Sequence, residues 1–266
     1  MAKRDPLSHT PTKPGAVWVT GAGKGIGRAL ALRLAARGHT VAASARTGTD
    51  LESLAAEAEG LPGSIFPVTL DVADAASVKA AIDRIEQAIG PLDLAILNAG
   101  THQPLSAKDF DVSVFRSLID VNLMGTVHCL AEILPGFIGR RAGTIAVVSS
   151  VAGYRGLPTA AAYGATKAAL INMCEALKPE LDQAGVRLAL INPGFVDTPL
   201  TRRNDFPMPF LISSEEAADH IMRGLDRGAF EIVFPWRMAL AMKLLRLMPY
   251  SAYFALSRRM LPAQEG

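Results

Sequence analysis

The sequence is poor in cysteine: Cys129 and Cys174 are the only two among 266 residues. Two thiols so far apart do not indicate a disulfide framework or a metal centre, and His39, His128 and His220 have no partners that suggest one, so no metal is expected. Each cysteine is predicted to be a buried small apolar residue, which fits a reducing, cytoplasmic compartment.

Long apolar runs and a strong net charge are also missing. No stretch of about 18 apolar residues occurs, so no spanning helix is expected. Residues 1–14 carry charge and proline but no apolar signal core, and they are expected to be disordered. A net charge of +2 gives no reason to expect nucleic acid, while 50% hydrophobic residues suit a globular domain with a large core.

What the sequence does contain is a regular alternation of short apolar runs and helical periodicity. Parallel strands need helical crossovers that cover both sheet faces, so the alternation predicts one doubly wound α/β domain over residues 15–235. Residues 236–266 follow as a C-terminal helical extension. The predicted strands are 16–20, 40–45, 64–70, 92–98, 144–150, 186–192 and 230–234, and the predicted helices are 26–38, 49–59, 74–89, 111–137 and 160–184.

A glycine cluster, "TGAGKGIG" from Thr20 to Gly27, follows the first strand and opens the first helix. Backbone N–H groups at the start of a helix bind a dinucleotide pyrophosphate at this position, and glycines allow the close approach. The spacing of Gly21, Gly25 and Gly27 around Ile26 differs from the commoner G-x-G-x-x-G. A tight strand-to-helix turn is the alternative, but its place in the chain favours a cofactor site.

No acid ends the second strand, where an NAD site often has one. The strand ends at Ala45 and Arg46, and no carboxylate occurs before Asp50. Arg46 can form a bidentate contact with a 2′-phosphate, and Lys24 adds a second cation. The two could also be ordinary solvated charges, yet together they favour NADP(H) over NAD(H).

Several further motifs occur in a fixed order. Together they resemble the short-chain dehydrogenase/reductase family over residues 15–200, and the resemblance implies a Rossmann domain with a seven-stranded parallel sheet flanked by helices. The motifs are "TGAGKGIG", "LDV" at 70–72, "NAG" at 98–100, "VN" at 121–122, "SS" at 149–150 with "YGATK" at 163–167, and "NPGFVDTP" at 192–199.

The resemblance also implies roles at the cofactor. Asp71 would bind the adenine amino group, and Val72 would offer its backbone there. Leu97 replaces the first of two asparagines that the family often has. The other implied contacts are Asn98, Ala99 and Gly100 beneath the cofactor, and Pro193, Gly194, Val196 and Thr198 around the nicotinamide.

Tyr163 and Lys167 lie one helical turn apart, which suits carbonyl chemistry. A phenol is a poor acid at a pKa near 10, and a neighbouring ammonium should lower that pKa. Ser150 could bind the same substrate oxygen. The resemblance implies that Lys167 also binds the nicotinamide ribose and that Asn122 holds a water linked to the lysine. A Tyr-x-x-x-Lys spacing arises often by chance, but its order behind the glycine loop favours an active site.

The predicted function is the NADP(H)-dependent interconversion of a carbonyl and a secondary alcohol. An NAD-dependent alcohol dehydrogenase and a non-catalytic NADP-binding regulator are the alternatives, and the intact Ser150, Tyr163 and Lys167 argue against the regulator. The resemblance suggests a homodimer or homotetramer built through 111–137 and 160–184. His102 faces either the substrate or solvent.

Two segments bear on the substrate. Residues 195–212 combine prolines with large apolar residues and suggest a lid over a lipophilic substrate, or else an inert surface loop. From Trp236 to Arg259 there are five arginines or lysines and no acid. So apolar a helix is expected to bury most of its surface on its own domain or a neighbouring subunit; the alternative is a membrane-surface helix.

Overall fold

The structure is a computed structural model that describes residues 15–203 and 208–261. The segment 1–14, expected to be disordered, lies outside the described residues, as do four residues of the expected lid, 204–207, and the last five of the chain. The expectations for those residues therefore stay predictions.

A single seven-stranded sheet organises the chain, and all its strand pairs are parallel, as the alternation predicted. The strand order is β3-β2-β1-β4-β5-β6-β7, so the chain builds one half outward from β1 and then returns to build the other from β4. A crevice opens at the carboxyl ends of β1 and β4, where the order reverses. The strands are β1 (Ala16–Thr20), β2 (Thr40–Ala45), β3 (Ser64–Thr69), β4 (Leu94–Leu97), β5 (Thr144–Val148), β6 (Arg187–Pro193) and β7 (Glu231–Phe234).

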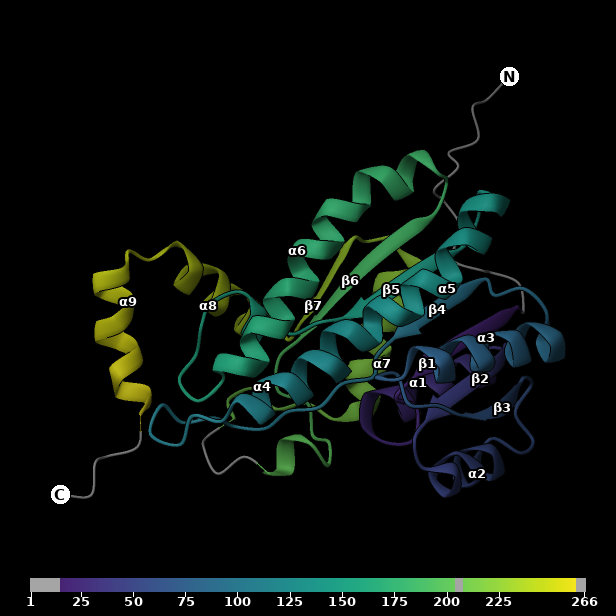
Figure 1. Cartoon of the computed structure of the whole chain (residues 1–266), viewed down its shortest axis with the longest axis horizontal. Helices are drawn as coiled ribbons and strands as arrows, with labels where there is room; N and C mark the ends of the chain where they lie inside the picture. The colour runs from purple at the N-terminus through teal and green to yellow at the C-terminus, as the bar shows by residue number, and fades with distance from the viewer. Residues whose placement is uncertain (1–14, 204–207, 262–266) are drawn as a thin grey trace.

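Helices cover both faces of this sheet (Figure 1). One core layer contains buried residues of α1, α2 and α7, and the other contains those of α3, α5 and α6. Strand β1 serves both layers, since Trp18 joins one and Val17 and Val19 join the other, as side chains of a strand alternate. The main helices are α1 (Gly25–Ala36), α2 (Gly48–Glu57), α3 (Ala75–Ile89), α4 (Val112–Leu118), α5 (Gly125–Arg140), α6 (Ala161–Gln183), α7 (Ser214–Asp226), α8 (Trp236–Leu247) and α9 (Tyr250–Ser257).

The predicted helix 111–137 is interrupted. Between α4 and α5 the chain forms a π-helical turn, Ile119–Met124, which contains Asn122. By length and composition, the whole segment Val112–Arg140 could cross a membrane. Here its residues Cys129, Ile133 and Phe137 are buried in the core, which is the arrangement of a core helix. Cys129 and Cys174 are both buried with free thiols, as predicted.

Helix α7 was missed by the sequence prediction. Its start is a capping box in which the Ser213 hydroxyl accepts from the Glu216 amide and the Glu216 carboxylate accepts from the Ser213 amide. Ala217, Ile221 and Leu225 form its buried stripe against the sheet. Both signals are present in the sequence, so local pattern alone is enough to predict this helix.

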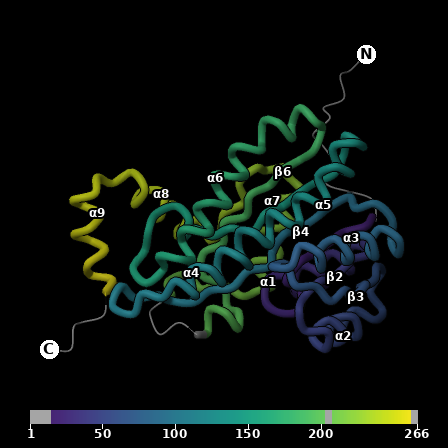
Figure 2. The backbone as a smooth tube through the Cα atoms, in the orientation of Figure 1, coloured from purple at the N-terminus to yellow at the C-terminus, as the bar shows by residue number. Residues whose placement is uncertain are grey.

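The C-terminal extension consists of α8 and α9 and projects from one end of the molecule (Figures 1 and 2). Only Ala239 and Met242 of α8 are buried, while Leu244 and Leu247 are 56% and 82% exposed. This helix therefore does not bury most of its surface on its own domain, and its burial on a neighbouring subunit or at a membrane surface stays a prediction. Helix α8 packs on the domain through one side only, since it follows β7, which is the edge strand of the sheet.

Candidate functional site

Two adjoining hollows follow the crevice at the carboxyl ends of the strands. They share Gly21, Lys24, Gly100 and Thr101, so they form one continuous groove. Ser150, Tyr163, Lys167, Pro193, Gly194, Val196 and Thr198 line the first hollow, together with Gly25, Ile26 and Asn98. Arg46, Asp71, Val72 and Ala99 line the second.

The glycine loop between β1 and α1 is packed too tightly for side chains. Gly21 has φ of +65°, and a Cβ there would lie 2.8 Å from the Ala99 Cα. A Cβ on Gly27 would lie 2.3 Å from the Gly21 carbonyl oxygen, and one on Gly25 would lie 2.9 Å from the Thr198 Cγ2. Glycine is required at each position, and the loop exposes its backbone to the groove.

The "NAG" turn after β4 holds this loop in place. The Asn98 side chain donates to the carbonyls of Thr20 and Gly21, at 3.0 and 3.2 Å. The buried Thr20 hydroxyl in turn accepts from the amides of Asn98 and Ala99, both at 3.0 Å. Asn98 therefore acts on the cofactor loop by supporting it, and Thr20 is a supporting residue that the motif reading did not single out.

The second hollow contains both cations expected for a 2′-phosphate. Arg46 is exposed and forms no ion pair with any described residue, whereas the Lys24 ammonium pairs with Asp50 at 3.2 Å. Helix α2 brings Asp50 into the same hollow. A Cβ added to Gly23 would lie 3.1 Å from the Cβ of Asp50. In the sequence, Asp50 lies too far past the end of the second strand to be the usual ribose-binding acid. The fold nevertheless places it beside the two cations.

The far end of that hollow is formed by the turn after β3. The Asp71 carboxylate accepts from the Ala73 amide at 3.0 Å, which fixes the turn. The Val72 carbonyl lies 3.0 Å from Nδ1 of His128 on α5. His128, which the sequence did not suggest as a site residue, thus holds the backbone that is expected to face an adenine ring.

Ser150, Tyr163 and Lys167 meet in the first hollow although 17 positions separate the serine from the lysine along two different elements. Ser150 lies two residues after the end of β5 and caps the short 3₁₀ turn Val151–Gly153, where its hydroxyl accepts from the Ala152 amide at 3.1 Å. Tyr163 and Lys167 lie in the first two turns of α6. The three residues that the sequence selected are therefore brought together.

Burial dominates the ionisation of this group. Desolvation raises the pKa of Tyr163, and the hydrogen-bonding interaction with Ser150 opposes that rise. Desolvation lowers the pKa of Lys167 to about 8. The Lys167 ammonium lies 5.7 Å from the centre of the Tyr163 ring and donates to the Val148 carbonyl at 3.0 Å, so burial outweighs it in setting the direction of the Tyr163 pKa shift. Stabilisation of the phenolate by Lys167 stays a prediction.

Asn122 is fully buried and joins three segments. Its side chain accepts from the Thr101 amide at 2.7 Å and donates to the Thr101 carbonyl at 2.9 Å and the Thr166 hydroxyl at 3.2 Å. A Cβ on Gly100 would lie 3.3 Å from the Asn122 Oδ1 and 3.5 Å from the Lys167 Nζ. The π-helical turn aims this amide at the active site, as such turns often do at functional sites.

His102 lies against the predicted acid. Its ring meets that of Tyr163 edge to face, with 4.7 Å between centres. Its Nδ1 is buried and has no hydrogen-bond partner among the described residues, and burial lowers the pKa of the imidazole. Of the two orientations left open by the sequence, the structure supports the one toward the site.

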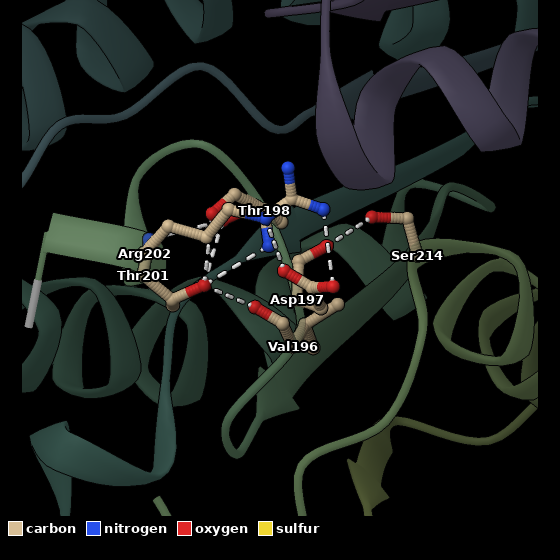
Figure 3. A network of polar contacts seen from close by, with 6 residues as sticks. All are labelled: Val196, Asp197, Thr198, Thr201, Arg202 and Ser214. Carbon is tan, nitrogen blue, oxygen red and sulfur yellow. Dashed lines mark hydrogen bonds and ion pairs between the residues drawn. The ribbon is translucent and has the colours of Figure 1, made fainter.

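The loop after β6 is held by a compact polar network (Figure 3). The Thr201 hydroxyl donates to the Val196 carbonyl at 2.6 Å, and the Thr198 amide donates to the Thr201 hydroxyl at 3.0 Å. Asp197 pairs with Arg202 at 2.7 Å, and its carbonyl accepts from the Ser214 hydroxyl at 2.9 Å. Thr198 is thereby fixed against Gly25, where the expected nicotinamide residues border the glycine loop.

These features fit a nicotinamide dinucleotide. The groove is continuous, the glycine cradle has no room for a Cβ, and free and paired cations border the end opposite the catalytic trio. No group of three or more His, Cys, Asp or Glu side chains is placed to hold a metal ion within residues 15–203 and 208–261.

Comparison with known proteins agrees with this geometry. The family model for short chain dehydrogenase matches residues 15–206. An uncharacterized oxidoreductase of Myxococcus xanthus is 39% identical over 91% of this chain and 96% of its own length. The 3-oxoacyl-[acyl-carrier-protein] reductase FabG of Thermotoga maritima is 36% identical over 70% of this chain and 75% of its own length. A short-chain dehydrogenase of Sphingobium yanoikuyae, solved with NADPH, has a TM-score of 0.78 at 25% identity and covers 95% of this chain and 98% of that one.

Proposed function

The chain belongs to the short-chain dehydrogenase family and is an oxidoreductase; we propose that it uses NADP(H) to interconvert a carbonyl compound and a secondary alcohol. The observation that carries this proposal is the convergence of Ser150, Tyr163 and Lys167 beside the glycine loop in one groove. A binding module would need the loop but would gain nothing from a phenol, a hydroxyl and a buried ammonium at one point.

The residues of the chain supply the proton and the charge stabilisation. A bound nicotinamide would supply the hydride. Tyr163 is the general acid, because its phenol is protonated at neutral pH and lines the same hollow as Ser150 and Lys167. Ser150 donates to the same substrate oxygen, and the Lys167 ammonium stabilises the phenolate left after proton transfer. Asn122 holds Thr101 and the π-helical turn in position beside Lys167.

The preference for NADP(H) rests on Arg46, which is free to meet a 2′-phosphate. The Sphingobium structure, solved with NADPH, is consistent with it. An NAD-dependent alcohol dehydrogenase is the second candidate. One observation favours it: Asp50 lies in the second hollow and forms an ion pair with Lys24. An acid there could accept from a ribose hydroxyl, as in NAD sites.

A lipophilic substrate is proposed from the loop at 195–212. Within its described residues Phe210 and Leu211 are each 45% exposed, and the next residue, Ile212, pairs with Val196, which lines the first hollow. Movement of this loop over the groove would let the two side chains cover an apolar ligand. The Thermotoga relative, by its name, reduces a 3-oxoacyl group carried on acyl-carrier protein. We also propose a cytoplasmic homodimer or homotetramer, since Val112, Ile119 and Ile138 leave apolar surface on the helical segment expected to pair.

The proposal is tested by following the loss of reduced-nicotinamide absorbance over a panel of ketones and aldehydes, with NADPH and NADH in parallel. Tyr163→Phe should bind NADPH as the wild type does but lose at least about a hundredfold in turnover. Undiminished turnover in this variant would overturn the role of Tyr163. Tight NADPH binding without turnover on any carbonyl would favour the non-catalytic regulator.

A further inference from the structure

The outer side of α8 and α9 is a large apolar surface. Trp236, Leu247 and Tyr250 are 68%, 82% and 68% exposed, far more than large side chains in a core helix. Isolated exposed apolar residues are ordinary, but many exposed large apolar side chains on two successive helices mark an interaction surface. We call this group the outer face; it consists of Trp236, Leu240, Leu244, Leu247, Tyr250, Phe254, Leu256, Met260 and Leu261.

The charges around the outer face have one sign. Arg237, Arg246, Arg258 and Arg259 are exposed and form no ion pair with any described residue. Lys243 is the exception, since it pairs with Glu231 of β7. No aspartate or glutamate occurs between Pro235 and Leu261. The surface therefore combines large apolar and aromatic side chains with unpaired cations.

Contacts from both helices attach them to the domain, and Tyr250 takes part in these contacts although it is 68% exposed. Met242 lies in the core, and the Tyr253 hydroxyl donates to the Gly156 carbonyl. The Arg155 guanidinium stacks on the rings of Tyr250 and Tyr253, at 4.6 and 4.4 Å from their centres, and donates to the Met248 carbonyl at 3.3 Å. The outer face is thus presented by a fixed element.

From these observations we propose that α8 and α9 dock on an anionic lipid surface. Apolar and aromatic side chains enter the boundary between headgroups and acyl chains, and arginines contact anionic headgroups. A second copy of this chain fits less well, because a two-fold interface would bring the same four unpaired cations of each copy together without an acid to neutralise them.

The docking element adjoins the active-site loop. Arg155 and Gly156, which hold α9, belong to the stretch that leads from Ser150 to Tyr163. A protein docked in this way holds the substrate end of the groove close to the membrane surface. Lipid binding itself does not depend on the proposed reductase activity, so each can fail without the other.

The first test is co-sedimentation of the full chain with vesicles of phosphatidylcholine alone and with vesicles of phosphatidylcholine mixed with phosphatidylserine, an anionic lipid of the cytoplasmic leaflet. Binding should be at least about tenfold stronger to the anionic vesicles and should fall as salt is raised from low to high concentration. Equal or no binding to both kinds of vesicle would overturn the proposal.

Two variants identify the surface. Leu244→Glu with Leu247→Glu should abolish vesicle binding, and Arg258→Glu with Arg259→Glu should weaken it at least about tenfold. Arg223→Glu in the last turn of α7 with Arg227→Glu directly after it is the matched control, because it removes the same charge elsewhere and should have little effect. Retained NADPH binding shows that each variant is folded. If Leu244→Glu with Leu247→Glu instead splits an oligomer and leaves vesicle binding unchanged, the outer face is a subunit interface.

Discussion

Lys24 and Asp50 form an ion pair, 3.2 Å from Nζ to Oδ2, in the hollow that also contains Arg46. The carboxylate neutralises one of the two cations expected to meet a 2′-phosphate, and as a like charge it would repel that phosphate. Cofactor preference therefore depends on the balance between Arg46 and Asp50 rather than on the cations alone.

Asp50→Asn should strengthen NADPH binding by about tenfold or more and leave NADH nearly unchanged, because it frees Lys24 and removes a negative charge. Arg46→Ala should weaken NADPH by a similar factor with little effect on NADH. Dissociation constants from quenching of protein fluorescence would measure both. Equal changes for the two cofactors would mean that neither side chain faces the 2′ position.

The pH dependence should follow Lys167. Burial lowers the pKa of Lys167 to about 8, so its charge is present below that pH and is lost above it. Carbonyl reduction needs this charge beside the developing phenolate, and kcat should therefore fall above about pH 8. A pH profile of kcat at saturating cofactor would test this, and Lys167→Met should lose both the descending limb and most of the activity. A flat profile to pH 10 in the wild type would contradict the assignment.

His102 should position the Tyr163 ring. The edge-to-face contact at 4.7 Å is of a kind worth about 0.5–1.5 kcal/mol, so His102→Ala should lower kcat by about three- to tenfold. His102→Phe keeps an aromatic ring of similar width and should retain most of the wild-type kcat. If His102→Phe is as impaired as His102→Ala, the imidazole nitrogen rather than the ring is what the site uses, and substrate binding becomes the better explanation.

Asn122 should contribute to both stability and activity. Asn122→Ala removes three hydrogen bonds and leaves the Thr101 amide without its acceptor, a loss of about 1–3 kcal/mol for each unsatisfied buried group. We expect a fall in Tm of several degrees and a drop in kcat. Asn122→Asp retains the acceptor for Thr101 and should lose less in Tm. An unchanged kcat in a folded Asn122→Ala protein would limit Asn122 to a structural role.

Much of the fold could be predicted from local patterns. Strand alternation and helical periodicity are properties of neighbouring residues, and they were enough for the seven strands and for most helices. The motifs also selected Ser150, Tyr163 and Lys167, because each belongs to a short segment whose place in a parallel sheet is set by chain order. The exception among the helices, α7, carried its own signals in Ser213, Glu216 and the stripe that follows.

Tertiary structure alone decided the relations between distant segments. Asp50, on α2, enters the cofactor hollow beside the end of β2. His102 meets Tyr163 because the loop after β4 and the start of α6 lie at the same edge of the sheet. The π-helical turn at Asn122 and the exposure of Leu244 and Leu247 depend on what packs beside them. Burial, not the spacing of Tyr163 and Lys167, sets the direction of both pKa shifts, because desolvation is a property of the assembled fold.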